Sequence, residues 1–450
     1  MQVPQALIQS LQQISGFDSK AFEEVHASGE QVVSIRLNPA KPVMSPNLVL
    51  DGRVPWCEQG YYLKERPFFT FDPLLHAGAY YVQEASSMFV WQALQQLMPD
   101  QAGKKVLDLC AAPGGKSTLL ASHFKEGLLV SNEVIKNRAA VLVENMSKWG
   151  TAAAVVTNND PSHFQSLPGY FDLILADAPC SGSGLFRKDP DAITHWSEDN
   201  VVLCSQRQQR ILADILPALK ENGILLYSTC SYSEAENEQI ADWLVGEMGM
   251  KSLGLERLAE WGIIETNSPA FGAKGYRFYP HQLKGEGFFL AAFQKQEAVG
   301  FKKQKPNQIS PLSKNELQQL QASLTLQEGL SFFQQSGAIR AIPEAWMSEI
   351  GLLASQLYIK KAGVEIGSLK GKDLVPAHEL ALSGLLMPSF PVLELDLEQA
   401  LLYLKRKELV LKGQNGWNLL QYCGLSLGWV KVLPNRINNY YPAEWRILKD

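Results

Sequence analysis

The sequence KKVLDLCAAPGGKST at residues 104–118 joins an apolar run to a turn that contains two glycines. The run KKVLDLC (104–110) has the composition of a strand that is buried on both faces. Gly114 and Gly115 let the backbone approach a ligand closely. A glycine-rich turn that opens a helix also presents backbone N–H groups to a ligand. We therefore expect a ligand-binding strand–turn–helix unit here.

Further apolar runs lie on the C-terminal side of this unit, and amphipathic stretches separate them. The runs lie at residues 128–134, 151–158, 171–179, 222–231 and 287–295. The stretch 201–223 reads as a helix that ends at Gly223. Alternating strands and helices predict a Rossmann-like α/β domain, with a parallel sheet covered by helices on both faces. Ligands of such sheets bind beyond the carboxyl ends of the strands.

Acidic residues follow the second and third predicted strands. Glu133 lies 25 residues after Asp108, a position that suits the hydroxyl groups of a ribose, and Asp160 could contact an adenine edge. NAD is the obvious alternative cofactor. However, the turn lacks the G-x-G-x-x-G pattern and the lysine spacing of a phosphate-binding loop. An adenosine cofactor without phosphate, such as S-adenosylmethionine, fits the turn better.

Two cysteines lie at the ends of the next two strands, in DAPCSG (177–182) and STCS (228–231). A thiolate that adds to C6 of cytosine makes C5 nucleophilic, so that C5 can accept a methyl group. This reaction also requires a group that favours protonation at N3 and a group that assists release of the product. Our hypothesis assigns Cys230 as the nucleophile, Asp177 to N3 and Cys180 to release. The target base must leave its stack to react.

The composition restricts the remaining possibilities. None of the six cysteines forms a C-x-x-C pair or a Cys/His cluster at zinc spacing, so we expect no metal site. We interpret Cys57, Cys204 and Cys423 as packing residues. The sequence shows no membrane-spanning run and no secretory signal, so we expect a cytoplasmic protein. The net charge of −5 argues weakly against nucleic-acid binding, but residues 400–450 carry eight Lys and Arg against three Asp and Glu.

The chain divides into five predicted regions. Residues 1–75 read as a small α+β unit and residues 76–296 as the catalytic domain. The polar, basic and proline-containing segment within 297–313 reads as a linker. A helical or mixed region at 314–380 and a region of short, Gly-punctuated strands at 381–450 complete the chain.

Many ordered motifs of the sequence resemble those of the Sun-domain RNA cytosine-C5 methyltransferases. They include SIRLN (34–38), GAYYVQEASS (78–87), DLCAAPGGKST (108–118), DAPCSGSG (177–184), FRKDP (186–190), TCS (229–231), ENE (236–238), RFYPH (277–281) and GEGFF (285–289). The resemblance implies Cys230 as the nucleophile and Cys180 as the residue that aids release. It also implies a set of residues that contact S-adenosylmethionine, namely Cys110, Ala111, Ala112, Pro113, Gly114, Gly115, Lys116, Glu133, Arg138, Asp160 and Asp177.

Within that family, VPWCEQG (54–60), GWVK (428–431) and NNYYP (438–442) resemble a branch that acts on 16S ribosomal RNA. The branch ends in a small PUA-like RNA-binding domain, which we expect at residues 381–450. The small N-terminal unit is also expected to bind RNA. The expected partner is 16S rRNA or the 30S subunit, without a membrane or a metal, and the expected state is a monomer.

Three alternatives remain open from the sequence. The same chemistry could act on tRNA, the sheet could belong to a nucleotide-binding oxidoreductase, or the chain could be a non-catalytic RNA-binding scaffold. The two cysteines at strand ends argue against the scaffold. Three motif residues have ordinary interpretations as well. Arg187 and Lys188 either hold RNA phosphate or are solvated, and His281 is expected to order the substrate side of the site.

Overall fold

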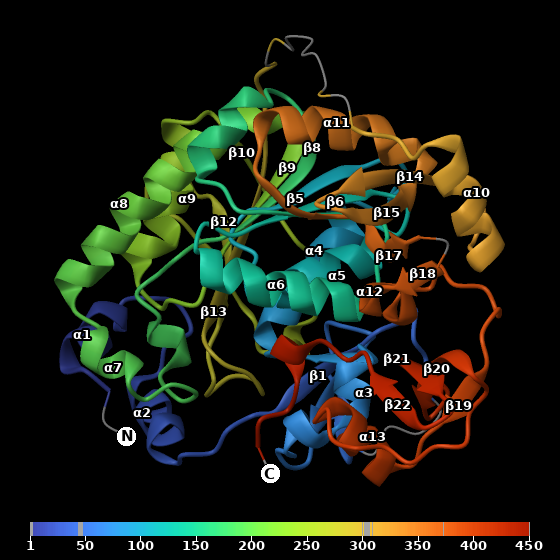
Figure 1. Ribbon diagram of the computed structural model, residues 1–450. Helices are drawn as coiled ribbons and strands as arrows, with labels where there is room; N and C mark the ends of the chain where they lie inside the picture. Colours follow the sequence, from blue (N-terminus) through green and yellow to red (C-terminus); the bar gives the residue numbers. More distant parts are fainter. Residues whose placement is uncertain are drawn as a thin grey trace.

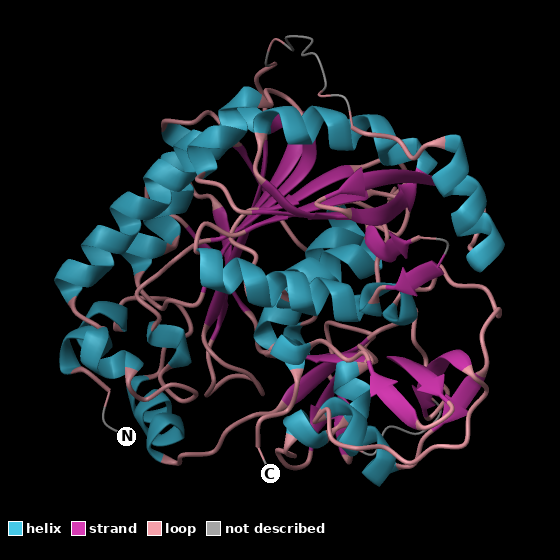
Figure 2. Ribbon diagram, viewed as in Figure 1, coloured by secondary structure: helices cyan, strands magenta, loops and turns pink. Residues whose placement is uncertain are grey.

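One large sheet organises the molecule (Figures 1 and 2). The computed structural model describes residues 3–43, 48–298, 300, 307, 309–371 and 373–449, so part of the predicted linker at 297–313 lies outside the described residues. The strand order in the sheet is β11-β12-β13-β9-β8-β5-β6-β7-β16, and β10 pairs with β13. The strands are β5 (Lys105–Asp108), β6 (Leu128–Asn132), β7 (Ala154–Thr157), β8 (Phe171–Asp177), β9 (Leu219–Thr229), β10 (Lys251–Leu253), β11 (Ile264–Asn267), β12 (Lys274–Phe278), β13 (Phe288–Gln294) and β16 (Ile359–Ala362).

The central strands of the sheet are parallel, and the strands toward its two edges pair antiparallel. Strands β9, β8, β5, β6 and β7 pair in parallel, which confirms the predicted Rossmann-like α/β core. The expectation of a wholly parallel sheet is wrong, because β13 runs antiparallel to β9 and β16 runs antiparallel to β7. Strands β12 and β13 are joined by a loop that is too short for a crossover helix, so these two strands pair antiparallel.

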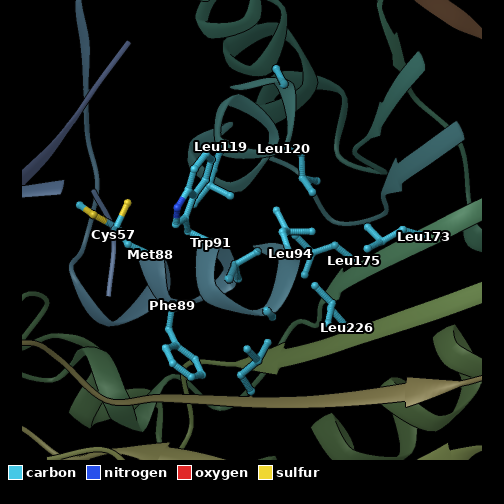
Figure 3. Packing of buried hydrophobic residues seen from close by; sticks show 14 of the residues in the cluster. Cys57, Met88, Phe89, Trp91, Leu94, Leu119, Leu120, Leu173, Leu175 and Leu226 are labelled. Carbon is cyan, nitrogen blue, oxygen red and sulfur yellow. The ribbon is translucent and has the colours of Figure 1, made fainter. Parts of the chain in front are cut away.

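Helices cover both faces of the sheet, and alternate residues of one strand serve the two faces. Leu173 and Leu175 of β8 belong to one buried cluster, whereas Ile174 between them belongs to the other. The first face packs against α4 (Val90–Leu97), α5 (Gly115–His123) and α6 (Lys136–Trp149). Figure 3 shows Leu173, Leu175 and Leu226 of the sheet facing the leucines of α4 and α5. The second face packs against α8 (Glu198–Ile215), α9 (Glu238–Gly246) and α11 (Met347–Gln356).

The predicted helix at 201–223 ends earlier than expected. Helix α8 stops at Ile215, a short 3-10 turn follows at Leu216–Ala218, and β9 begins at Leu219. Pro217 lies in that turn and has no N–H to continue the helix. Leu219 instead pairs with Phe171 of β8.

The N-terminal and C-terminal units pack against each other. The N-terminal sheet has the order β2-β3-β1-β4 and the C-terminal sheet the order β19-β20-β21-β22. Ile35 and Leu74 of the first unit share one apolar cluster with Tyr403 and Val430 of the second. Figure 1 shows α3 (blue) beside α13 and the red C-terminal strands. The elements are α1 (Gln5–Leu11), α2 (Ser19–Ala27), α3 (Pro73–His76), β1 (Ser34–Leu37), β2 (Leu50–Arg53), β3 (Gly60–Leu63), β4 (Tyr80–Val82), α13 (Leu397–Leu404), β19 (Val392–Glu394), β20 (Gly416–Tyr422), β21 (Leu425–Leu433) and β22 (Arg436–Asn439).

The region between the catalytic sheet and the C-terminal unit also joins the catalytic core. It contains a second four-stranded sheet, β14-β15-β17-β18. Trp346, Ile350 and Leu353, in and beside α11, pack in the same cluster as Leu107 and Ile174 of the large sheet. The further elements are α7 (Ala192–His195), α10 (Lys314–Ser323), α12 (His378–Leu382), β14 (Leu330–Gln335), β15 (Ala338–Pro343), β17 (Val364–Lys370) and β18 (Asp373–Pro376). None of the helices in the described ranges is long and apolar enough to cross a membrane.

We predict that Leu353→Ala lowers the free energy of unfolding of the whole catalytic core by about 2–5 kcal/mol. Leu353 is fully buried against the large sheet, so its truncation leaves a cavity in the shared core. Urea unfolding followed by tryptophan fluorescence measures the change, and Ser348→Ala on the exposed side of α11 is the matched control. If Leu353→Ala shifted only a minor, separate unfolding transition to lower urea concentration, α11 would fold independently of the sheet.

Candidate active site

The carboxyl ends of β8 and β9 bring the two predicted cysteines together. Asp177 pairs with Ser228 in the parallel register, and each strand then turns into a loop that carries a cysteine. The Sγ atoms of Cys180 and Cys230 lie 3.0 Å apart. Two thiols at this distance share a hydrogen bond, so the structure brings the two cysteines of the sequence hypothesis together.

Glu236 fixes the two cysteine loops to each other. This carboxylate is fully buried and accepts hydrogen bonds from the backbone N–H of Ser181 (2.7 Å) and the hydroxyls of Ser181 (2.6 Å) and Ser231 (2.5 Å). The backbone N–H of Gly184 also donates to the carbonyl of Cys230 at 2.8 Å. The loops are therefore held together by hydrogen bonds to one carboxylate and by one bond between their backbones. The sequence placed Glu236 in a family motif but gave no sign of this role.

The two thiols differ in their surroundings. The hydrogen bond with Cys230, together with burial and the nearby Glu236 carboxylate, raises the pKa of Cys180 well above its ordinary value. In the hydrogen bond between the two sulfurs either atom can be the donor. A thiol whose pKa is raised keeps its proton, so Cys180 is the weaker candidate for the nucleophile.

A salt bridge lies beside the sulfur pair. Lys116 Nζ lies 2.8 Å from Asp177 Oδ2, and the Ser228 hydroxyl donates to Asp177 Oδ1 at 2.7 Å. The Lys116 ammonium also lies 5.3 Å from the ring centroid of Phe288. Attraction to Asp177 outweighs burial and raises the pKa of Lys116. The site thus presents a fixed cation and a carboxylate next to the two cysteines.

The glycine turn between β5 and α5 forms the floor of the neighbouring cavity. A cavity of about 170 Å³ is lined by Tyr81, Gln83, Glu84, residues 110–113, Gly115, Lys116 and Asp177. Gly114 has a φ of 121°, which a side chain would disfavour, and α5 begins at the next residue. Arg138 donates to the carbonyl of Ala112 at 2.7 Å and Asn145 to the carbonyl of Pro113 at 2.8 Å, so helix α6 holds the turn in place.

The predicted acidic residues lie at neighbouring strand ends. Glu133 is 3% exposed, accepts a hydrogen bond from the N–H of Ile135 and lies 3.4 Å from Arg138. Asp160 caps a short 3-10 helix at Pro161–Ser166 through Ser162. Asp108, which the sequence used only to measure a spacing, is fully buried, and its Oδ1 has no hydrogen-bond partner. Burial raises the pKa of Asp108 to about 7, although Ser117 donates a hydrogen bond to it.

These residues suit a cationic nucleoside better than a nucleotide. S-adenosylmethionine carries a sulfonium and an ammonium, and acidic groups at the ends of β5, β6 and β8 would attract them. Asp108 Oδ1 is a buried acceptor that still lacks a partner. Among the residues that the structure describes, Lys116 is the only cation that lines the cavity, and it is paired with Asp177. No group of three or more His, Cys, Asp or Glu in the described part of the chain could hold a metal ion.

Two interpretations from the sequence are corrected. The side chain of Arg187 is neither solvated nor available to bind a phosphate, because it is 8% exposed and lies 3.4 Å from the buried carboxylate of Glu286. Cys423 is exposed and is not a packing residue. The ring of His281 lies against Phe17 and Phe22 of the N-terminal unit, and its expected role on the substrate side stays a prediction. Cys57 and Cys204 are buried, as expected of packing residues.

Family models match most of the chain. The model for the 16S rRNA methyltransferase RsmB/F matches residues 95–294, and the N-terminal domain of 16S rRNA methyltransferase RsmF matches residues 3–85. The RsmF PUA domain matches residues 390–447. The ribosomal RNA small subunit methyltransferase F of Shewanella loihica is 31% identical over 87% of this chain and 83% of its own length. The chain belongs to this methyltransferase F family.

Other comparisons agree with the family. The ribosomal RNA small subunit methyltransferase F of Aliivibrio fischeri is 32% identical over 87% of this chain and 85% of its own length. A methyltransferase homologue from Pyrococcus horikoshii has 29% identity and a TM-score of 0.51, over 65% of this chain and all of its own. The NSun6 structure from the same organism, determined with SFG, has 18% identity and a TM-score of 0.54, over 65% of this chain and 98% of its own. The last comparison shows the shared fold only.

We predict that Asp108→Asn changes how stability depends on pH. The pKa of Asp108 is about 7 in the folded protein and about 4 in the unfolded chain, so the folded state prefers the neutral carboxyl. Ionisation therefore destabilises the wild type increasingly between pH 4 and pH 7. The stability of Asp108→Asn relative to wild type should rise over this range and become constant above it.

Urea unfolding without cofactor at a series of pH values measures this difference. Asp189→Asn changes an exposed carboxyl and should give a much smaller pH-dependent difference. If the difference in the free energy of unfolding between Asp108→Asn and wild type stayed constant from pH 4 to pH 7, Asp108 would not be a neutral buried carboxyl.

Proposed function

We propose that the protein is an S-adenosylmethionine-dependent methyltransferase that methylates C5 of a cytosine in 16S ribosomal RNA, with Cys230 as the nucleophile. The observation that carries the proposal is the pair of sulfur atoms 3.0 Å apart beside the Asp177–Lys116 salt bridge and the glycine turn. The names of the related proteins support ribosomal RNA of the small subunit as the substrate.

Cys230 begins the reaction. Its sulfur, as the thiolate, adds to C6 of the cytosine and forms a C6–S bond, while the ring electrons move toward C5, N3 and O2. Cys180 stays protonated beside this sulfur because its pKa is raised, so it donates a hydrogen bond and does not compete as a nucleophile. The loops fixed by Glu236 keep the attacking sulfur in one position.

Lys116 and Asp177 act on the opposite edge of the pyrimidine. Asp177 holds the ammonium of Lys116 in a fixed place, and Ser228 holds Asp177. Addition of sulfur puts negative charge on N3 and O2 of the ring, which a preorganised cation stabilises. Since Asp177 is engaged by Lys116, we propose that the ammonium favours protonation at N3 and that the carboxylate positions it.

The residues that would hold the cofactor are the turn Cys110–Lys116 together with Glu133, Arg138, Asp160 and Asp177. When bound, S-adenosylmethionine supplies the methyl group from its sulfonium to C5. Arg138 shapes this site through its bond to Ala112 and its proximity to Glu133. The backbone of the turn approaches the ligand closely because Gly114 and Gly115 carry no side chain.

Cys180 completes the reaction. Once Cys230 is bonded to carbon, its hydrogen bond no longer raises the pKa of Cys180, whereas burial and Glu236 still do. Cys180 can then lose its proton to solvent and accept the proton from C5. The C5–C6 double bond reforms, the C6–S bond breaks, and its electron pair returns to Cys230 as the thiolate. N3 then loses to solvent the proton that it took up during the addition.

RNA recognition is assigned to the two small units, residues 1–75 and 381–450, of a monomeric protein. The C-terminal sheet carries an aromatic and cationic cluster that suits stacking on bases and contact with phosphates. Lys431 Nζ lies 5.4 Å from the centroid of Trp417, and the rings of Trp417 and Tyr440 are 4.4 Å apart. Residues 297–313 and 314–380 are proposed to connect this unit to the catalytic domain at 76–296.

We predict that Cys230→Ala abolishes methylation and leaves the affinity for S-adenosylhomocysteine within about twofold of wild type, because the thiol is needed for addition to C6 and not for cofactor binding. Bisulfite sequencing of 16S rRNA and tRNA from a deletion strain carrying each variant reads methylation, and calorimetry reads affinity. Cys423→Ala, an exposed thiol elsewhere, should behave as wild type. If the deletion removed a methyl group from tRNA and not from 16S rRNA, the substrate would be tRNA. If Cys230→Ala still methylated RNA, Cys230 would not be the nucleophile.

We predict that Cys180→Ala still attacks but releases product slowly, so that a covalent protein–RNA adduct accumulates. The variant lacks the group that accepts the C5 proton, and therefore the C6–S bond persists. A denaturing gel of enzyme, S-adenosylmethionine and substrate RNA should show an RNA-dependent band of slow mobility, absent from the double variant with Cys230→Ala. A Cys180→Ala enzyme that turns over normally without an adduct would contradict the role of Cys180.

A further inference from the structure

A segment from the C-terminal half of the chain reaches the carboxyl end of β7, near the proposed cofactor site. Strand β16 pairs antiparallel with β7, and Ile359 lies opposite Thr157, the last residue of β7. Tyr358, just before β16, therefore lies beside the loop that leaves β7 toward Asp160. The N–H of Asn158 donates to the carbonyl of Tyr358 at 3.2 Å, which extends the pairing to the loop itself.

Asn159 ties this loop to Tyr358 from its side chain. Its amide donates to the carbonyl of Tyr358 at 3.0 Å and accepts from the N–H of Tyr358 at 3.0 Å. Asn159 is 5% exposed, so both bonds are shielded from water. The backbone before Asp160 is therefore held directly by a residue about 200 positions later in the chain.

The same network continues to the glycine turn. The side chain of Asn132 accepts from the N–H of Asn159 at 3.0 Å and donates to the carbonyls of Asn159 (3.0 Å) and Leu109 (3.2 Å). Leu109 directly precedes the turn at Cys110. One chain of buried hydrogen bonds thus connects Tyr358, the loop before Asp160 and the start of the turn.

Three residues with exposed apolar side chains lie in the two segments whose backbones bond to Asn158. The amide of Asn158 donates to the carbonyls of Glu133 (2.6 Å) and Val134 (2.9 Å), while its backbone bonds to Tyr358. Val134, Ile135 and Tyr358 are 55%, 50% and 64% exposed. Apolar groups of this size at a strand end beside two acidic residues suit a flat, apolar ligand with polar edges.

We propose that Tyr358 forms the outer wall of the nucleoside end of the S-adenosylmethionine site, with its ring packed against the adenosine. This inference rests on the proposed cofactor. The occupant is adenosine because Glu133 and Asp160 flank the apolar group at the ends of β6 and β7. The C-terminal region thereby supplies a specificity-determining side chain to the cofactor site, although the nucleophile and the glycine turn lie in the N-terminal two-thirds of the chain.

The experiment uses the full-length protein and S-adenosylhomocysteine as the probe. Calorimetry should show that Tyr358→Ala raises the Kd about five- to tenfold, the loss expected for one ring contact. The KM for S-adenosylmethionine should rise similarly, with kcat and the KM for RNA unchanged. Tyr358→Phe, which keeps the ring, should bind as wild type. Phe271→Ala, an exposed aromatic (58%) at the opposite edge of the sheet, is the matched control and should also bind as wild type.

The outcomes separate this inference from the proposed function. Wild-type protein that does not bind S-adenosylhomocysteine overturns the cofactor assignment itself. Wild-type protein that binds while Tyr358→Ala binds equally well overturns the wall. If Tyr358→Ala and Phe271→Ala weaken the binding of S-adenosylhomocysteine equally, the proposed contact of Tyr358 is also wrong, because the effect is then not specific to Tyr358. If Tyr358→Ala lowers the melting temperature, Tyr358→Leu is tested instead, because it keeps an apolar side chain without the ring. Wild-type affinity for S-adenosylhomocysteine in that folded variant would contradict the role of Tyr358.

Discussion

The site depends on one constraint, the parallel pairing of β8 with β9. The register places Asp177 opposite Ser228, and the two strands then end at the same edge of the sheet. Each turn carries its cysteine only a few residues beyond this pair, so the two sulfur atoms meet. A shift of the register by one residue would turn the side chains of one strand to the other face. Burial of both faces of β8 by separate helix layers opposes such a shift.

The electrostatics of the site follow from this geometry and from burial. Glu236 is fully buried but receives several hydrogen bonds, so it organises the cysteine loops. Asp108 is equally buried and has only the bond from Ser117, so its pKa is raised to about 7. Lys116 remains a cation because Asp177 is within hydrogen-bond distance. The three buried groups therefore differ. Glu236 organises the cysteine loops, Asp108 favours its neutral form, and Lys116 remains an ammonium beside the proposed pyrimidine site.

Much of the catalytic core could be predicted from the sequence, because its signals are local. Apolar runs and the glycine turn mark β5 to β9, and the cysteines follow strands whose ends must coincide in a parallel sheet. Contacts between distant segments were not predictable. Arg187 looked like a phosphate ligand because the sequence does not show that Glu286 is buried against it. Similarly, β16 carries no local sign that it will pair with β7, and Pro217 ended a helix that the periodicity continued.

Shared apolar cores connect the small units and the C-terminal region to the rest of the chain. The N-terminal and C-terminal units pack together through Ile35, Leu74, Tyr403 and Val430, and α11 packs on the large sheet. Strand β16 then continues that sheet and holds the loop before Asp160 through Tyr358. The C-terminal region is thus part of the structure that shapes the catalytic domain, in addition to its proposed role in holding RNA.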